Sequence, residues 1–166
     1  NHIPLDKWSR RFFTSLETLH VYNKNDEHFE EETFHKRVYH YEIQYSEEWA
    51  KKKENEEYKH VVLDEETAER LGTIPEGVTR IGANCLNSNV KITEIIMPKS
   101  VTSIGENAFR ELYNLTRIVL STNLKKISSW CFRDLESLKE ITIPDSVTSI
   151  GGGFLQWCDK MTSMTM

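Results

Sequence analysis

The sequence predicts an α/β solenoid in which short parallel strands stack from one repeat to the next. Three observations support this prediction. The strings IPEGVTRIG, MPKSVTSIG, LSTNLKKIS and IPDSVTSIG begin 23 residues apart, at Ile74, Met97, Leu120 and Ile143. The same positions of each unit are apolar, and each unit holds segments in which apolar and polar residues alternate. A period of about 20 to 50 residues is typical of stacked-repeat proteins.

The apolar positions of the repeat explain why the units must stack. The eighth position of the four units holds Ile81, Ile104, Ile127 and Ile150, and the thirteenth holds Leu86, Phe109, Phe132 and Leu155. One unit cannot bury these side chains by itself. Stacked units can, because each row of side chains then lies against its copies above and below.

Local patterns predict the elements of each unit. ITEIIMP, LTRIVLS and LKEITIP alternate apolar and polar residues, which is the spacing of a strand. VTRIG and VTSIG alternate in the same way and predict a second short strand. ENAFREL and SWCFRDL predict a helical turn or short helix. Each unit is therefore expected to run strand, turn, strand, helical turn, with parallel copies about 4.8 Å apart.

The string VTSIGENAFRELYNLTRIVLS resembles the BspA-type leucine-rich repeat. The resemblance covers residues 74–166, as four 23-residue units of which the last is truncated, and it implies a leucine-rich repeat solenoid. The third unit departs from the family pattern at Ser121 and Ser128, where proline and glycine are usual. The fourth has Gly152 and Gly153 ahead of Phe154, which weakens the prediction of a helical turn there.

Residues 1–73 are predicted to form an atypical N-terminal cap. LETLHVYN has the spacing of a degenerate repeat strand, and KRVYHYEIQY and VVL at 61–63 predict further strands. Residues 47–57 are charged without an apolar stripe, so we expect an exposed loop or frayed helix. Asp64 is placed to cap a short helix over residues 65–71 that ends at Gly72. This region resembles the N-terminal part of BspA-like proteins of parasitic amoebae, in which an F-box-like segment often precedes it.

Composition excludes several classes of function. The chain has 166 residues, a formal net charge of −5 and 38% hydrophobic residues. Residues 1–73 carry a net charge of −6 and residues 74–166 a net charge of +1. Neither part has the basic surface that nucleic-acid binding needs. No apolar run is long enough for a transmembrane segment.

The three cysteines predict free thiols. Cys85 and Cys131 share the twelfth position but are two units apart, about 10 Å at strand spacing and beyond disulfide reach. Cys158 falls in another position. We expect thiols packed in the core, and such thiols favour a reducing compartment.

Candidates for catalysis or metal binding are weak. His28, Glu31, Glu32 and His35 could share a helical face, but their spacing matches no known metal motif. Glu56 and Glu57 with His60 could suggest acid–base chemistry, yet no nucleophile motif accompanies them. The glycines at 151–153 lack the lysine of a phosphate-binding loop. We favour the interpretation that the two groups of histidine and glutamate are solvated polar residues and that the glycines form a loosened turn. We therefore expect no metal, cofactor or small-molecule substrate.

The strand face is the better candidate for a functional surface. Residues on either side of the buried twenty-second position point outward, and we predict that they bind a protein partner: Glu94, Ile96, Arg117, Val119, Glu140 and Thr142. The alternative is that opposite charges on adjacent strands only stabilise the sheet.

We therefore expect a non-enzymatic protein-interaction module. One hypothesis is a cytoplasmic adaptor, which an F-box-like segment would link to ubiquitin ligase machinery. The alternative is a cell-surface adhesin, because the resemblance extends to bacterial proteins that bind host matrix. The chain stops on a strand with Met161, Met164 and Met166 in apolar positions. We therefore expect that the native protein continues or that this chain self-associates end to end.

Overall fold

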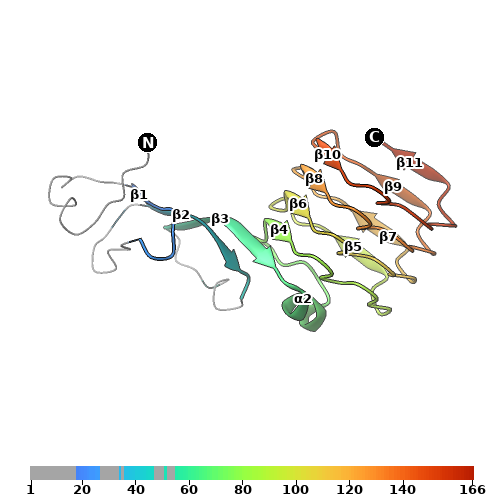
Figure 1. Ribbon diagram of the computed structural model, residues 1–166, viewed down its shortest axis with the longest axis horizontal. Helices are drawn as coiled ribbons and strands as arrows, with labels where there is room; N and C mark the ends of the chain where they lie inside the picture. Colours follow the sequence, from blue (N-terminus) through green and yellow to red (C-terminus); the bar gives the residue numbers. More distant parts are fainter. Residues whose placement is uncertain (1–17, 27–33, 35, 47–50, 52–54) are drawn as a thin grey trace. The chain divides into compact units, whose positions relative to one another are not determined.

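The computed structural model describes residues 18–26, 34, 36–46, 51 and 55–166. The chain divides into two compact units (Figure 1). Unit 1 spans residues 1–43 and 47–60, and unit 2 spans residues 44–46 and 61–166. The division falls within strand β3, Glu56–Leu63, whose last three residues belong to unit 2.

Unit 1 is built on parallel strands with an aromatic core. Strand β1 (Thr18–Val21) pairs with β2 (Lys36–Gln44), Thr18 lying opposite Lys36. The start of β3 lies on the other side of β2, where the Arg37 amide donates to the carbonyl of Asn55 (2.7 Å). The buried core contains Leu19, Val21, Phe34 and Tyr39, with Tyr41 and Tyr58 packed against it.

Both strands predicted in this part of the chain are confirmed, but the predicted loop or frayed helix over residues 47–57 is wrong at its end. Glu56 and Glu57 begin β3. Residues 47–50 and 52–54 lie outside the described residues. Tyr58 stacks on Tyr39 of β2, with ring centroids 4.5 Å apart. Cross-strand packing of this kind outweighs the low strand propensity of glutamate.

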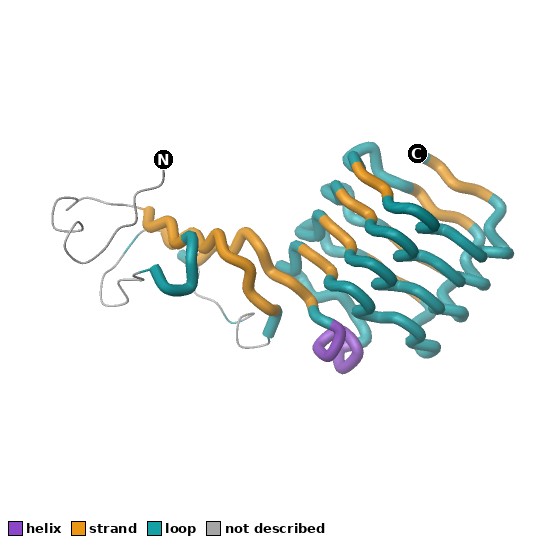
Figure 2. The backbone as a smooth tube through the Cα atoms, in the orientation of Figure 1, coloured by secondary structure: helices purple, strands orange, loops and turns teal. Residues whose placement is uncertain are grey.

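Unit 2 contains four stacked coils of 23 residues, which we number coil 1 (74–96), coil 2 (97–119), coil 3 (120–142) and coil 4 (143–165). Each coil contributes a short first strand and a longer second strand, and Figure 2 shows successive coils lying in parallel. The first strands are β4 (Arg80–Ile81), β6 (Ser103–Ile104), β8 (Lys126–Ile127) and β10 (Ser149–Ile150). The second strands are β5 (Glu94–Ile96), β7 (Arg117–Val119), β9 (Glu140–Thr142) and β11 (Ser163–Thr165).

The registers confirm the predicted parallel stack. In the first strands Ile81 lies opposite Ile104, Ile104 opposite Ile127, and Ile127 opposite Ile150. The first three are buried, with at most 1% of their surface exposed, whereas Ile150 is 39% exposed. Ile150 is exposed because β10 is the edge strand of this sheet among the described residues.

The predicted helical turns are wrong: residues 83–88 and their equivalents in coils 2 to 4 form hydrogen-bonded turns without a helix. In coil 1 the amides of Asn84, Leu86 and Ser88 donate to carbonyls of coil 2 at 2.8–3.0 Å. A helix would direct these amides to carbonyls within its own segment. Bonding between coils therefore replaces bonding within a helix.

The backbone of these turns has a positive φ at the eleventh and fifteenth positions of every coil. The values lie between 53° and 66°. The eleventh position holds Asn84, Asn107, Trp130 and Gly153, and the fifteenth holds Ser88, Glu111, Asp134 and Trp157. In coils 1 to 3 every second amide, from the first of these left-handed residues to the second, donates to a carbonyl of the next coil.

The main core runs through all the coils. Its largest fully buried members include Phe109 and Phe132, whose rings stack nearly parallel with centroids 5.5 Å apart. Leu124 and Leu135 are also completely buried. Truncating a buried phenylalanine to alanine typically costs about 3–5 kcal/mol, so these stacked side chains are a principal source of stability.

Helix α2 (Glu65–Leu71) precedes coil 1 and has the bounds that the sequence predicted. The Asp64 carboxylate accepts a hydrogen bond from the Thr67 amide (2.8 Å), and Gly72 ends the helix with a φ of 64°. Ala68 is fully buried in the main core. The end of β3 pairs with β4, Leu63 lying opposite Ile81. Strand and helix together therefore pack against the first coil.

The cysteines are free thiols, as predicted. Cys85 and Cys131 are buried, and Cys158 is half-buried. The Cys85 thiol donates to the carbonyl of Leu63 (2.9 Å), and the Cys158 thiol to that of Phe132 (3.1 Å). Burial raises the pKa of Cys85 to about 12, and the nearby Asp64 carboxylate adds to this rise. Burial also raises the pKa of Cys131 and Cys158.

We expect Gly105→Ala to destabilise the protein by more than about 2 kcal/mol. A Cβ at Gly105 would lie 2.5 Å from the carbonyl carbon of Gly82 in the coil before it, and this main-chain atom is held by the stack. Gly152→Ala is the matched control because a Cβ there meets nothing within 4 Å. The control should be neutral or stabilising by up to about 1 kcal/mol. Urea unfolding measures both free energies; equal losses would contradict the close contact.

The thiols should react in a fixed order. At pH 8 a disulfide reagent should modify Cys158 first, while Cys85 and Cys131 react only when the protein unfolds, because they are buried with a raised pKa. The two buried thiols should also make the stability of the protein depend on pH. Folding raises the pKa of Cys85 and Cys131 above the usual 9.0, so their contribution to the free energy of unfolding is fully present below pH 9. It should decrease as the pH rises from 9 toward 12. Rapid modification of all three thiols in the folded protein would contradict the predicted order of modification.

Candidate functional site

The six residues predicted to bind a partner lie on one exposed surface of unit 2. Strands β5, β7 and β9 each bury their middle residue and expose the residues on either side. Because side chains alternate across a strand, the first and third residues share a face. We call this surface the strand face. It comprises Glu94, Ile96, Arg117, Val119, Glu140 and Thr142, continued by Ser163 and Thr165 of β11.

The strand face has one charged row and one largely uncharged row. In the charged row the Arg117 guanidinium contacts the Glu94 carboxylate of the adjacent strand. Both side chains remain about half exposed, at 59% and 46%. An exposed ion pair of this kind contributes only about 0–1 kcal/mol. In the other row Ile96 is 58% exposed and Val119 38% exposed, so the face offers apolar area beside its charges.

The ladder beneath the strand face is interrupted once. Strand β5 pairs with β7, and β9 pairs with β11, each in parallel register. Strand β7 lies beside β9, but the two are not joined in one sheet. The interruption falls between coil 2 and coil 3, and coil 3 is the repeat with Ser121 and Ser128 in place of proline and glycine.

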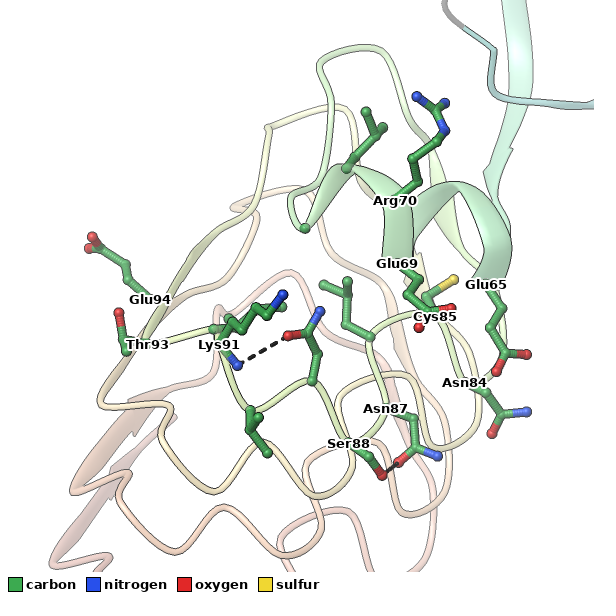
Figure 3. Close-up of a pocket in the computed structure, with 16 residues that line it drawn as sticks. Glu65, Glu69, Arg70, Asn84, Cys85, Asn87, Ser88, Lys91, Thr93 and Glu94 are labelled. Atoms are coloured by element: carbon green, nitrogen blue, oxygen red, sulfur yellow. Dashed lines mark hydrogen bonds between the residues drawn. The ribbon is translucent and has the colours of Figure 1, made fainter.

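A groove between helix α2 and coil 1 was missed by the sequence analysis. Its volume is about 740 Å³, and it is lined by residues 65, 69–72 and 84–94. Figure 3 shows Glu65 and Glu69 extending from the helix toward coil 1, while Arg70 points away from it. No signal in the sequence indicates this groove, because it depends on how the helix packs on the coil.

The groove does not contain a nucleophile ready to react. Cys85 lines it, but its thiol is committed to the carbonyl of Leu63 and burial raises its pKa to about 12. A thiol in this state is almost entirely protonated near neutral pH and is therefore a poor nucleophile. Other polar groups of the groove are also hydrogen-bonded: the Ser88 hydroxyl donates to the Glu111 carboxylate of coil 2 (2.8 Å), and the Lys91 amide donates to the side-chain oxygen of Asn89 (3.2 Å).

The turns on another side of the stack expose two tryptophans. Trp130 is 40% exposed and Trp157 56% exposed, both at positive φ. The Arg133 guanidinium lies 4.1 Å from the centre of the Trp157 ring. A Cβ at Gly153 would lie 2.5 Å from the Trp130 ring. Gly153 is therefore needed by this turn, where it also occupies a left-handed position, whereas a Cβ at Gly152 would meet nothing within 4 Å.

Of the other sequence candidates, Glu56, Glu57 and His60 all lie on strand β3, and the rest lie outside the described residues. His28, Glu31, Glu32 and His35 lie outside them. Within the residues that the structure describes, no group of three or more histidine, cysteine, aspartate or glutamate side chains could hold a metal ion. In the same part of the chain, no helix has the length and apolar character needed to cross a bilayer.

Unit 1 brings together two histidines that the sequence analysis did not connect. His20 of β1 and His40 of β2 lie with Nδ1 of the first 2.9 Å from Nε2 of the second. Tyr22 stacks on the His40 ring, with centroids 4.3 Å apart and planes inclined by 8°. Both histidines lie in predicted strands, but only the pairing of those strands makes them neighbours.

Comparison with known proteins supports the fold. A leucine-rich repeat protein from Bacteroides capillosus is 37% identical, over 54% of this chain and 63% of that one, with a TM-score of 0.50. A second, from Bacteroides ovatus, is 29% identical, over 69% of this chain and 31% of that one, with a TM-score of 0.57. The pneumococcal vaccine antigen PcpA, 18% identical over 90% of this chain and 38% of that one, shares the fold with a TM-score of 0.53. The match thus spans less than two thirds of the length of each of these three proteins.

No curated protein matches the sequence. A family model, the BspA type leucine rich repeat region, matches residues 70–166 in six copies. The match covers more than half of the chain, and the matched range includes all four coils with their parallel strands. The chain therefore belongs to the BspA-type leucine-rich repeat family.

Proposed function

We propose that this chain is a non-catalytic protein-binding module and that its strand face contacts the partner. The exposure of Ile96 and Val119 on adjacent strands carries the proposal. Leucine-rich repeats generally mediate protein–protein interaction or adhesion. Repeat stacks do so by presenting a continuous surface built from equivalent positions of successive repeats.

The chemistry of the strand face suits a protein partner. Isoleucine and valine supply apolar area that gains free energy when covered, at about 25 cal/mol per Å². The neighbouring Glu94, Arg117 and Glu140 are exposed charges. Because the Glu94–Arg117 pair stabilises the fold little, either side chain is available to pair with a charge of the partner. Charged rims of this kind chiefly set specificity and the rate of association.

The absence of catalysis is part of this proposal. The described groove at α2 lacks an activated nucleophile, since the Cys85 thiol is protonated and hydrogen-bonded. Repeats of this family are typically binding modules. A binding role therefore accounts for the exposed strand face without requiring a reaction.

Two cellular settings fit a binding module, and we favour a cytoplasmic adaptor. The free state of Cys85, Cys131 and Cys158 supports it, because thiols persist where glutathione and thioredoxin keep them reduced. The alternative is an adhesin at the cell surface. The family match supports this alternative as well, because leucine-rich repeats mediate adhesion in addition to protein–protein interaction.

The double variant Ile96→Asp with Val119→Asp should strongly weaken partner binding while leaving the fold intact. Two carboxylates in the middle of the contact would be desolvated without a partner, which costs several kcal/mol. Proximity labelling in cells, with the full chain as bait, identifies proteins enriched over background. Titration of the purified partner then measures affinity, which should fall by at least about 100-fold.

The double variant Val90→Asp with Tyr113→Asp is the matched control. Val90 is 55% exposed and Tyr113 38% exposed, which matches the exposed fractions of Ile96 and Val119. The two control residues lie elsewhere, in the turns that precede the second strands. Circular dichroism and melting should show that all variants fold. Loss of binding in the control alone would move the contact away from the strand face, and equal binding by all variants would refute the strand face as the interface.

A further inference from the structure

We propose that the His20–His40 pair of unit 1 binds a divalent first-row transition-metal ion, copper most tightly, across strands β1 and β2. This site is separate from the strand face and does not depend on the proposed protein-binding function. It rests on the geometry of two imidazoles that sequence alone does not bring together.

The strand register puts the two imidazoles on one face of unit 1. His20 lies opposite Val38 in the parallel pair of β1 and β2. Since alternate residues of a strand share a face, His40 points to the same side as Val38 and therefore as His20. The two rings lie with centroids 5.2 Å apart and planes inclined by 28°. Two nitrogen ligands are thus held on adjacent strands by main-chain pairing and not by a flexible loop.

The separation of the facing nitrogens suits cis ligands of one ion. His20 Nδ1 and His40 Nε2 are 2.9 Å apart. Two metal–nitrogen bonds of about 2.0–2.1 Å that meet at about a right angle hold their nitrogens about 2.9 Å apart. Right-angled ligands are typical of tetragonal Cu²⁺ and Ni²⁺. Small rotations of the two rings would turn both lone pairs toward the ion, and water would complete the coordination.

Metal binding replaces the hydrogen bond that now joins the rings. In that bond one facing nitrogen carries a proton and the other accepts it. When the donor imidazole changes tautomer, its proton moves to the other ring nitrogen through solvent. Both facing nitrogens then present lone pairs, and each ring stays neutral. No net proton is released, and no oxidant or reductant is needed.

The surroundings restrain one ring. The pKa of His40 is lowered, first by partial burial and then by the electrostatic influence of its neighbours His20, Lys59 and His60, against the opposing effect of Glu57. Tyr22 stacks on the His40 ring and limits its rotation. Nearby Lys36 and Lys59 both contact the Glu57 carboxylate, which offsets part of the positive charge.

Calorimetric titration of the full chain, without an affinity tag, with Cu²⁺, Ni²⁺ and Zn²⁺ at pH 7.5 tests the proposal. We expect Cu²⁺ to bind most tightly, as the usual order of these ions requires, and Mg²⁺, which prefers oxygen ligands, not to bind at this site. His20→Asn and His40→Asn should each weaken Cu²⁺ binding by at least about tenfold. His60→Asn on neighbouring β3 is the matched control and should leave the affinity unchanged.

Electron paramagnetic resonance of the Cu²⁺-loaded wild-type protein provides a readout that does not depend on whether a variant folds. It should show two coupled imidazole nitrogen ligands. Equal Cu²⁺ affinity in the wild type and both variants would overturn the proposal. Loss of binding upon replacement of His28 and His35, with His20 and His40 intact, would also overturn it, because the ion would then belong elsewhere in the chain.

Discussion

Main-chain hydrogen bonding between coils is the constraint on which unit 2 depends. The first strands form one ladder, the second strands form two shorter ladders, and the turns donate every second amide to the next coil. An isolated coil would leave these amides and carbonyls in water and its apolar side chains uncovered. Stability therefore belongs to neighbouring coils jointly, and the 23-residue period is the length at which the bonds on all sides stay in register.

The turns show how this constraint selects residues. Two positions of every coil need a positive φ, which asparagine and glycine adopt at low cost. Asn84, Asn107 and Gly153 follow that preference. Trp130 and Trp157 do not, and both also expose much of their ring to water. Because glycine leaves room for the Trp130 ring beside Gly153, neighbouring coils adapt to each other's side chains while their hydrogen bonds stay constant.

The same constraint gives the strand face its character. Alternation buries Ile95, Ile118 and Ile141 and leaves the flanking side chains in solvent whatever their chemistry. The fold therefore tolerates changes on this face, and its residues are free to serve recognition. Unit 1 uses parallel strands differently. Its core combines Leu19 and Val21 with aromatic side chains, and the register of β1 and β2 aligns two histidines on its other face.

The sequence by itself determined the solenoid, its period, its parallel strands, its buried ladders and the six residues of the strand face, because each follows from a periodic apolar pattern. It also determined helix α2, since Asp64 and Gly72 signal its ends locally. Only the tertiary structure decided that segments such as ENAFREL form turns and not helices, because their amides are satisfied by a neighbouring coil. It alone decided that Glu56 and Glu57 join a strand, that α2 and coil 1 enclose a groove, and that His20 meets His40. Each of these depends on which segments lie side by side, and a local pattern carries no such information.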